Sequence, residues 1–320
     1  MVVGMRPSSE LRVSELSVVI VSWNVRDLLK TCLRSLLVDL EQADLEAQVW
    51  VVDNASTDDT PAMVAGQFPA VHLIARDDNP GFAASNNLAI GAILRSTQHA
   101  TRNTQYIWLL NPDTEVRPGA TAALLAALEA HPRAGIAGAR LLYPDGSLQQ
   151  SAFRFPGLVQ LAFDLFHLPP RLYATSLNGR YPRRLYEGTI PFRIDHPLGA
   201  AMMVRAEAVA QVGLMDEGYT MYCEEIDWCW RMRQAGWQAL CVPTARVVHH
   251  TGQSTAQVPI HSFVNLWTSR ARLYARYHGP LARQMARMLV RAGMRQRMRG
   301  ASPEVAAACR QIVQTWETVR

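Results

Sequence analysis

Residues 106–116 read YIWLLNPDTEV, an apolar run that ends abruptly in a proline and a carboxylate. A run of this length is too short for a core helix and is typical of a strand buried on both faces of a sheet. Pro112 lacks a backbone donor, so the strand is expected to stop there and to hold Asp113 at its carboxyl end. Ligands of open α/β sheets bind at that end. The alternative is a plain strand-to-turn junction, because Asn, Pro and Asp are common turn residues.

Similar short strands are expected before this stretch, at residues 16–21, 49–52 and 71–75, where β-branched and other apolar residues gather. Leucines at helical spacing over residues 27–37 indicate an amphipathic helix after the first of them. Regular alternation of strand and helix predicts a mostly parallel, doubly wound sheet whose polar loops meet at one edge.

Later parts of the chain give weaker signals. Pro118 is expected in the first turn of a helix over residues 118–130, and Ser56 or Thr57 is expected to cap an earlier helix. Residues 142–197 mix Pro, Gly, aromatic residues and arginine without clear periodicity, as in a functional lid or recognition region. Further strands are expected at residues 198–205, 239–242 and 246–248.

Composition describes a globular protein. The 320 residues are 49% hydrophobic and 18% charged, and the length allows a sizeable core. The first 17 residues lack the apolar segment of a secretory signal, and no stretch is long enough to span a bilayer. The five cysteines form no C-x-x-C pair, so we expect neither a disulfide framework nor a zinc site. A reducing, cytoplasmic location fits this cysteine content best.

Basic residues are unevenly distributed within the net charge of +5. No Asp or Glu occurs between Asp227 and Glu304, while arginine recurs, which favours polyanions such as diphosphates or anionic lipids. Aromatic residues do not interleave with the arginines as in a single-strand binder, so we expect no nucleic acid partner. Near the C-terminus, one helical face is apolar and the other is basic, which fits either a membrane interface or a helix packed on the domain. The apolar face comprises Leu281, Met285, Met288, Leu289 and Ala292, and the basic face comprises Arg283, Arg287, Arg291 and Arg295.

Four polar turns follow the four expected strands, at Asn24, Asp53, Asn79 and Asp113. Asp53 resembles the acidic residue that accepts hydrogen bonds from a base or ribose in nucleotide folds. The G-x-G-x-x-G fingerprint and the Walker loop are both absent from the sequence. A diphosphate would therefore be held by another device, and Mg²⁺ or Mn²⁺ on Asp113 is the economical one.

A second carboxylate cluster contains Glu224, Glu225 and Asp227. Such residues are favourable at a helix N-terminus without any catalysis, or one of them acts as general base for an acceptor hydroxyl. His249 follows a strand and precedes a glycine-containing loop, where a role in a site is plausible beside a structural one.

These motifs, taken in order, resemble glycosyltransferase family 2, and within it the bacterial rhamnosyltransferase-like branch. The resemblance covers roughly residues 15–280. Its first half comprises SVVIVSWN (17–24), VVDNASTD (51–58), NPGF (79–82) with Asn86-Asn87, and LNPDT (110–114). Its second half comprises Gly199-Ala200, GLMDE (213–217), EEID (224–227), Gly236-Trp237, and His249 with Gly252 and Ser254.

The resemblance implies a GT-A fold, in which a Rossmann-like, mostly parallel sheet is flanked by helices and followed by a C-terminal helical segment. It also implies an inverting enzyme that uses a nucleoside-diphosphate sugar with Mn²⁺ or Mg²⁺. Residues 14–116 would form the nucleotide-sugar-binding half, residues 117–255 the acceptor-binding half, and residues 256–320 a basic helical segment.

Site residues follow from the same resemblance. Glu225 is the first choice for the base, with Asp227 and Glu224 left open, and Asp113 and His249 would bind the metal. Two positions depart from the family pattern: Asn111 replaces a carboxylate of the D-x-D motif, and Glu225 stands where Asp is frequent. The donor would contact Ser22, Trp23, Asn24, Asp53, Ser56, Asn79, Gly81, Phe82, Asn86 and Asn111. The acceptor would contact Gly199, Ala200 and Trp228.

The expected function is transfer of a sugar, with rhamnose as one candidate, from a dTDP- or UDP-sugar to a hydroxyl group. The acceptor would be a glycan or a polyprenyl-linked glycan used in cell-envelope polysaccharide synthesis. The protein would then be peripheral on the cytoplasmic face of the inner membrane. One alternative is a sugar nucleotidyltransferase, which the lack of glycine in residues 21–25 disfavours. Another is a non-catalytic nucleotide- or carbohydrate-binding module derived from a transferase.

Overall fold

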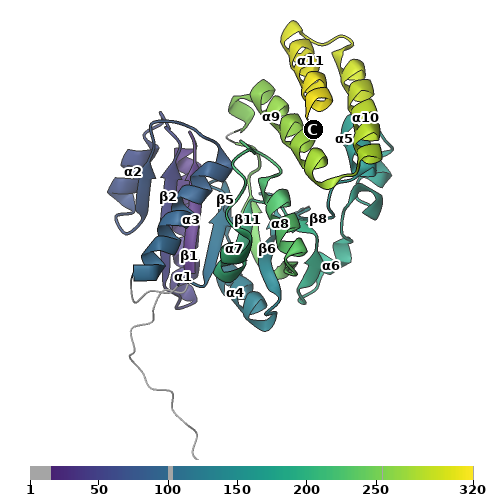
Figure 1. Ribbon diagram of the computed structural model, residues 1–320. Helices are drawn as coiled ribbons and strands as arrows, with labels where there is room; N and C mark the ends of the chain where they lie inside the picture. Colours follow the sequence, from purple (N-terminus) through teal and green to yellow (C-terminus); the bar gives the residue numbers. More distant parts are fainter. Residues whose placement is uncertain (1–15, 100–103, 254, 320) are drawn as a thin grey trace, which may run out of the picture.

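One mixed β-sheet runs through the molecule between two layers of helices, and a group of C-terminal helices rises above one end of it (Figure 1). This computed structural model describes residues 16–99, 104–253 and 255–319. Within these residues the sheet has ten strands, eight of them in the order β3-β2-β1-β4-β11-β6-β12-β5, with β7 beside β6 and β9 beside β12.

The first four strands of that order are parallel, as the sequence predicts. They are β3 (His72–Ala75), β2 (Ala47–Asp53), β1 (Leu16–Ser22) and β4 (Tyr106–Leu110). The connecting helices are α1 (Arg26–Gln42), α2 (Thr60–Gln67) and α3 (Phe82–His99). The polar residues that follow these strands therefore lie along one edge of the sheet.

Beyond β4 the strand directions change, so the sheet is mostly but not wholly parallel. β11 (Ala201–Arg205) is antiparallel to both β4 and β6 (Ala134–Leu142). β12 (Gln238–His249) runs parallel to β6 and pairs on its other side with the short antiparallel strand β5 (Thr114–Val116). The helices of this half are α4 (Ala120–Ala130), α7 (Ala206–Val212) and α8 (Glu224–Gln234).

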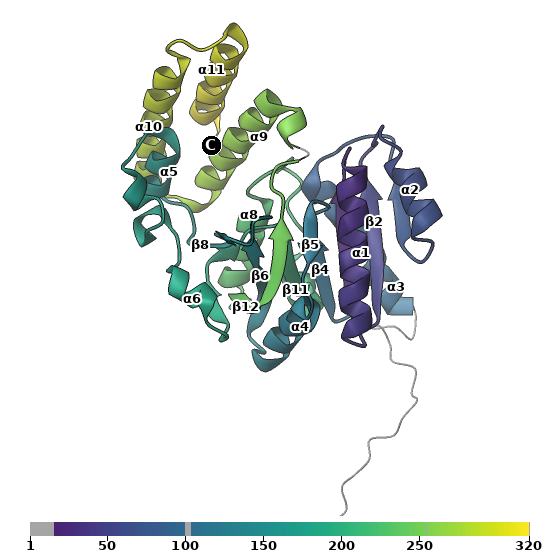
Figure 2. The same ribbon diagram turned by 180° about the vertical axis from the view of Figure 1, so that it is seen from behind.

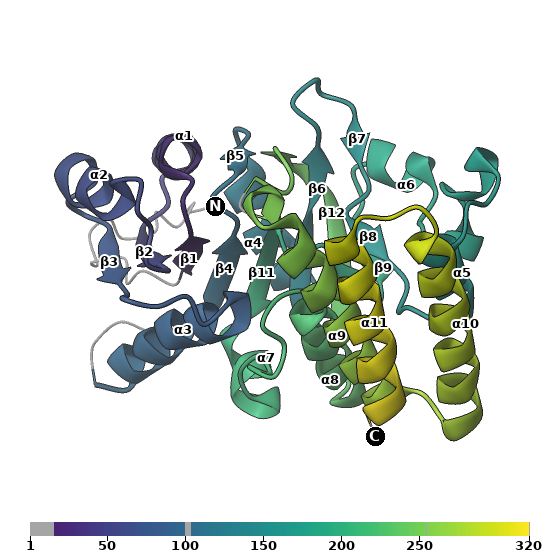
Figure 3. The same cartoon turned by 90° about the horizontal axis from the view of Figure 1, so that it is seen from above.

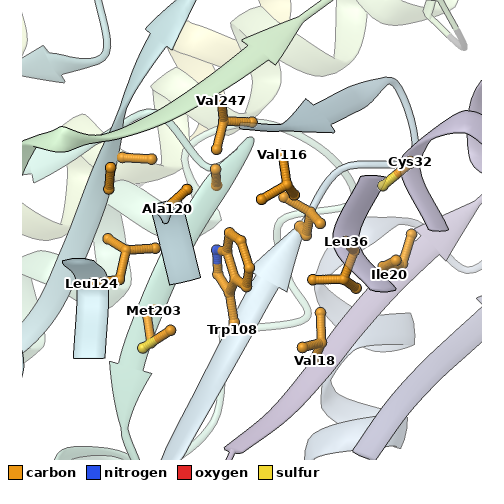
Figure 4. Packing of buried hydrophobic residues seen from close by; sticks show 14 of the residues in the cluster. Val18, Ile20, Cys32, Leu36, Trp108, Val116, Ala120, Leu124, Met203 and Val247 are labelled. Carbon is orange, nitrogen blue, oxygen red and sulfur yellow. The ribbon is translucent and has the colours of Figure 1, made fainter. Parts of the chain in front are cut away.

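Each face of the sheet has its own apolar core, because strand residues alternate between the faces. The face seen in Figure 2 is covered by α1, α2 and α4, and the opposite face by α3, α7 and α8; the view along the strands in Figure 3 separates the two layers. Trp108 of β4 is fully buried in the first core, among Leu36, Val116, Ala120 and Leu124 (Figure 4).

The stretch of residues 106–116 forms two strands where one was expected. All five residues of β4 are buried, which confirms the predicted strand, and β4 ends at Leu110 just before Asn111 and Pro112. Asp113 follows this turn, and the chain then enters β5, which pairs with the last residues of β12 and packs beside α1. The strands expected at 239–242 and 246–248 are in fact one strand, β12, with an irregularity between Val242 and Arg246.

Two helix starts differ from the expectation. Neither Ser56 nor Thr57 caps α2, because this helix begins at Thr60, and the Oδ1 atom of Asp58 accepts from the Thr60 backbone N–H at 3.3 Å. Pro118 precedes α4 instead of lying in its first turn, since Gly119 takes the N-cap position with φ of 82°.

The irregular region is built from short elements. They are β7 (Leu148–Gln149), β8 (Ala152–Phe153), α5 (Leu158–Leu165), the 3₁₀ turns η1 (Pro170–Leu172) and η2 (Ser176–Asn178), α6 (Arg183–Glu187), β9 (Phe192–Ile194) and β10 (His196–Pro197). β8 and β10 form a separate two-stranded sheet.

The C-terminal helical segment is present, as expected from the sequence. A 3₁₀ turn, η3 (Thr255–Gln257), leads into α9 (Pro259–Tyr277), α10 (Pro280–Met298) and α11 (Pro303–Thr318). These helices share one apolar core with α5, which joins the irregular region to the C-terminal segment. In the part of the chain that is described, no helix is both long and apolar enough to cross a bilayer. All five cysteines are buried as free thiols.

Candidate active site

The turn that carries Asp113 is held by three hydrogen bonds. The Asn111 N–H donates to the carbonyl of Ala200 at 2.8 Å, and the Thr114 hydroxyl donates to the carbonyl of Asn111 at 2.7 Å. The His250 N–H donates to the carbonyl of Asp113 at 2.9 Å. Both ends of the turn are thus fixed to neighbouring strands, so the position of the Asp113 carboxylate is set by the sheet.

Asp113 and His249 lie side by side. The antiparallel pairing of β5 with β12 places His249 opposite Thr114, the residue after Asp113. The Nε2 atom of His249 is 3.4 Å from Oδ1 of Asp113, and the two residues are only 5% and 6% exposed. The structure therefore brings together the two residues expected to bind a metal.

Gln149 of β7 fixes the histidine ring. Its side-chain N–H donates to the Thr251 hydroxyl at 2.7 Å, which leaves its carbonyl oxygen to face Nδ1 of His249 at 3.0 Å. Nδ1 then carries the ring proton, and the Nε2 lone pair faces the Asp113 carboxylate. Two electron-rich atoms at this distance are best satisfied by a cation between them, so the pair fits a metal.

Such a site would offer two protein ligands to the metal. Among the described residues, no three His, Cys, Asp or Glu side chains form a metal-binding group. Mg²⁺ usually keeps several waters and binds through one or two carboxylates together with substrate phosphates, so two ligands suffice. The Gln149–His249 contact is of the kind that orients metal-binding histidines. Sequence reasoning missed Gln149 because the irregular region offers no periodic signal.

The carboxyl ends of β1 and β2 present two buried oxygens without partners. Ser22 and Asp53 are neighbours in the strand register and are 0% and 1% exposed. Asp53 uses Oδ2 to accept from the Ser56 N–H at 2.9 Å. Among the described residues, Oδ1 of Asp53 and Oγ of Ser22 have no hydrogen-bond partner. Buried polar atoms without partners are rare, so these two oxygens are candidates for ligand contacts.

Other residues that are expected to contact the nucleotide sugar tie the loops after β1 and β2 to each other. The backbone N–H of Asn24, which has φ of 52°, donates to the Ser56 hydroxyl at 2.8 Å. The Oδ1 atom of Asn24 accepts from the Thr57 N–H at 2.8 Å. The loops after β1 and β2 are thus tied together, with the partly exposed Trp23 beside them.

The loop before α3 touches the second half of the chain. The Asn79 side chain accepts from the Gly81 N–H at 3.2 Å, and the Phe82 N–H donates to the carbonyl of Thr220 at 3.0 Å. Gly81 has φ of +97°, and a Cβ atom there would lie 2.1 Å from that same carbonyl oxygen, so only glycine fits. Asn86 is buried and donates to the carbonyl of Phe82 at 2.9 Å, which stabilises the first turn of α3.

The acidic cluster lies at the start of α8, as expected. Tyr222 and Cys223 precede it with φ of 70° and 68°, a strained pair that sets the direction of the helix. Glu224 is buried, and its Oε2 atom has no hydrogen-bond partner in the part of the chain that the structure describes. Burial together with the charge of Glu225 raises the pKa of Glu224. Glu225 is partly exposed, and burial of its carboxylate raises its pKa to about 7.

Asp227 is occupied by structural contacts. Its carboxylate pairs with Arg231 at 2.8 Å and with Arg276 at 3.0 Å, and it accepts from the Tyr277 hydroxyl at 2.8 Å. The side chain is fully buried. Asp227 therefore anchors α9 to α8, and its geometry is poorly suited to taking a proton from a ligand.

Gly199 and Ala200 connect the two groups of acidic residues. A Cβ atom on Gly199 would lie 3.6 Å from Cγ of Glu225, so the Glu225 side chain passes directly over this glycine. The next residue, Ala200, accepts the hydrogen bond from Asn111 described above. Two consecutive residues thus separate the Glu225 carboxylate from the turn that holds Asp113.

The expectation that Trp228 contacts an acceptor is wrong. Its side chain is 0% exposed within the second apolar core, and its indole N–H donates to the carbonyl of Gly213 at 2.8 Å. Trp230 is the partly exposed tryptophan of α8, and it stacks between Phe155 and Tyr277 with ring centroids 4.2 and 4.3 Å away. Trp228 shares the buried face of α8 with Met232, four residues later.

Comparison with known proteins gives consistent matches. Residues 17–213 match the family model described as "Glycosyl transferase family 2". An N-acetylglucosaminyl-diphospho-decaprenol L-rhamnosyltransferase of Mycobacterium tuberculosis is 33% identical over 248 residues, which are 76% of this chain and 78% of that protein. The dTDP-rhamnosyl transferase RfbF of Shigella flexneri is 25% identical, covering 78% of this chain and 75% of that protein.

A solved structure of GalNAc-T7 with UDP, GalNAc and Mn²⁺ resembles this chain with a TM-score of 0.59 at 15% identity. The match covers 95% of this chain and 55% of that protein. This likeness confirms the expected GT-A type of fold.

Proposed function

Because the chain belongs to glycosyl transferase family 2, we propose that it is an inverting, metal-dependent rhamnosyltransferase. In this proposal it transfers L-rhamnose from a nucleoside-diphosphate sugar, dTDP-rhamnose in the first instance, to an N-acetylglucosaminyl-diphospho-polyprenol. The mycobacterial relative acts on N-acetylglucosaminyl-diphospho-decaprenol and the Shigella relative is a dTDP-rhamnosyl transferase, which supports this choice of acceptor and donor. The product would be used in cell-envelope polysaccharide synthesis on the cytoplasmic face of the membrane.

One observation carries the proposal: the contact of Gly199 with Glu225 and of Ala200 with the Asp113 turn. A transferase needs a base beside the acceptor hydroxyl and a diphosphate site on the opposite side of the anomeric carbon. The Glu225 carboxylate and the Asp113–His249 pair supply these two groups, and residues 199–200 lie between them. A pure binding module has no need for a carboxylate with a raised pKa at this position.

The proposed reaction is a single displacement. Glu225 accepts the proton of the acceptor hydroxyl while that oxygen forms a bond to the anomeric carbon. The bond from this carbon to the diphosphate oxygen breaks on the opposite face, and the nucleoside diphosphate leaves. The configuration at the anomeric carbon is thereby inverted.

Asp113 and His249 would hold the Mn²⁺ or Mg²⁺ ion, with Gln149 orienting the histidine. A bound divalent cation neutralises charge that develops on the leaving diphosphate. Oδ1 of Asp53 would accept a hydrogen bond from the nucleoside, and the Ser22 hydroxyl would donate one to it. Residues 14–116 would then form the donor half and residues 117–255 the acceptor half, with Gly199 and Ala200 at the boundary of the two ligands.

A thermal-shift panel of nucleotide sugars with Mn²⁺ tests the proposal. A ligand at 100 times its Kd stabilises the folded state by about 2.7 kcal/mol, so dTDP-rhamnose is expected to raise the melting temperature only when Mn²⁺ is present. Asp113→Ala is expected to remove the shift, and calorimetry with and without Mn²⁺ should give the same result. Stabilisation by no nucleotide sugar, or an equal shift in Asp113→Ala, would argue against the proposal.

A further inference from the structure

Helix α10 is apolar on two opposite sides. One side carries small and medium residues in the core shared with α5, α9 and α11: Ala286, Val290, Gly293 and Met294 are all buried. Gly293 contacts Leu165 of α5 so closely that an added Cβ atom would lie 2.6 Å from it. Packing on the domain is thus satisfied by this side alone.

The other side exposes large apolar side chains to solvent. Leu281, Met285 and Met288 are 72%, 42% and 58% exposed, and Ala292 is also exposed. They are spaced four, three and four residues apart, so they form one stripe along the helix. We call these four residues the α10 stripe. Exposed contiguous apolar residues of this kind mark protein or membrane interaction sites.

Arginines flank the α10 stripe on one side. Arg291 and Arg295 lie three residues after Met288 and Ala292, on adjoining positions of the same face. Arg291 pairs with Glu317 of α11. Within the described residues, Arg283, Arg295 and Arg299 contact no carboxylate. No Asp or Glu occurs from residue 228 to residue 303, so nothing on α9 or α10 neutralises this field.

We propose that the α10 stripe and its flanking arginines dock on the surface of an anionic lipid bilayer. Leu281, Met285 and Met288 would enter the boundary between headgroups and acyl chains, and Arg295 and Arg299 would contact anionic headgroups. Charge selects this occupant over a second copy of the chain. A symmetric dimer through the stripe would bring Arg295 and Arg299 of both copies together, and neither pairs with a carboxylate among the described residues.

The docking surface is connected to the site that contains Glu225. Helices α9–α11 rise above the sheet at the end where the parallel strands carry their polar loops (Figures 1 and 2). Arg276 and Tyr277 of α9 hold Asp227 of α8, two residues after Glu225. A bilayer bound at α10 would therefore lie on the side of the molecule that a lipid-linked acceptor must reach. This last step rests on the proposed function, whereas lipid binding itself does not.

Vesicle co-sedimentation of the full chain tests the docking. The probes are vesicles of phosphatidylcholine alone and of phosphatidylcholine mixed with phosphatidylglycerol. The wild type is expected to bind the mixed vesicles, and added salt is expected to weaken binding. Leu281→Ser/Met285→Ser/Met288→Ser should weaken it at least about a hundredfold. Arg295→Gln and Arg299→Gln should each weaken it about fivefold, converted from about 1 kcal/mol per basic residue.

The matched control is Leu37→Ser/Val38→Ser on α1, a helix that covers the sheet away from α10. It removes apolar side chains that are 37% and 47% exposed. It should bind vesicles as the wild type does. Mn²⁺-dependent donor binding should be unchanged in the stripe variant, which separates this proposal from the proposed function and shows that the variant is folded. Wild-type binding by the stripe variant, or equal binding to both vesicle types, would overturn the proposal. So would a concentration-dependent dimer that the stripe variant abolishes, since the stripe would then belong to a second copy.

Discussion

Replacing Glu225 by glutamine is expected to remove most sugar transfer and to leave donor binding intact. Glutamine keeps the length of the side chain and its contact with Gly199, but it accepts no proton. General-base catalysis typically contributes about 10²–10⁴-fold, so kcat should fall at least about a hundredfold. The donor KM should change little, because Asp53, Asp113 and His249 are untouched.

The same residue predicts how the rate of the wild type depends on pH. Burial raises the pKa of Glu225 to about 7, and only the ionised form accepts a proton. A group with this pKa is about one-eleventh ionised at pH 6 and about ten-elevenths ionised at pH 8, so kcat/KM should rise roughly tenfold between them. In Glu225→Gln the rise should disappear together with the rate.

Initial rates with dTDP-rhamnose and an N-acetylglucosaminyl-diphospho-polyprenol, measured from pH 6 to pH 8, give kcat and the pH dependence of kcat/KM. Glu207→Gln on α7 is the control, because it removes an exposed carboxylate outside the acidic cluster. Glu224→Gln distinguishes the neighbouring carboxylate. The assignment of Glu225 fails if its glutamine variant stays within about threefold of the wild type, or if Glu224→Gln is the variant that loses the rate and the pH dependence.

Three further predictions concern positions around the site. Gln149→Leu removes the oxygen that faces Nδ1 of His249 and should weaken Mn²⁺ binding, measured by calorimetry, about 10–100-fold. Gln149→Glu keeps an acceptor oxygen and should largely restore Mn²⁺ affinity. Equal Mn²⁺ affinity in the wild type and both variants would exclude this role of Gln149. Burial raises the pKa of Glu224 above its unfolded value, so the native state keeps this proton longer than the unfolded chain and loses stability as pH rises above about 4.3. Glu224→Gln removes this loss, so its melting temperature relative to the wild type should increase from pH 5 to pH 9; a constant difference would contradict the buried, neutral carboxyl. Gly81→Ala would place a Cβ atom 2.1 Å from the Thr220 carbonyl oxygen and should cost about 2 kcal/mol or more in denaturant unfolding. Gly119→Ala, also at positive φ but with no atom within 4 Å of the added Cβ, should cost clearly less.

Much of the first half could be predicted because its signals are local. β1, β2 and β4 are short apolar runs that end in polar loops, and residues of that kind form strands buried on both faces. Asp113 could be assigned to the carboxyl end of a strand from Pro112 alone. Parallel order then predicted that Asp53 and Asp113 share one edge of the sheet.

Contacts between distant segments could not be predicted from such runs. β5 is only three residues long, and its pairing with β12, which brings His249 to Asp113, leaves no local pattern. Gln149 and α5 lie in a region without periodicity, and α5 completes a core whose other helices follow about a hundred residues later. The spacing of apolar residues in one sequence indicates which residues share a helix face, but it does not indicate which other element covers that face.

In helix α10, the sequence did not indicate which face packs on the domain. The sequence grouped Leu281, Met285, Met288, Leu289 and Ala292 on one face. Four of them are exposed, but Leu289 is partly buried against the core shared with α5. The sequence could not tell a packed position from an exposed one. The packed face consists of smaller residues, including Ala286 and Gly293, which let α10 approach α5 closely. The larger apolar residues are left outside, where the bilayer proposal accounts for them.

The most direct test of the central claim is one transfer assay with product analysis. Wild type and Asp113→Ala are incubated with dTDP-rhamnose, an N-acetylglucosaminyl-diphospho-polyprenol and Mn²⁺, and the product is examined by mass spectrometry and by NMR of the anomeric proton. The wild type is expected to add one rhamnose with inverted anomeric configuration, and no product is expected from Asp113→Ala or after chelation of the metal. Transfer with retention, or equal transfer by Asp113→Ala, would contradict the proposed function.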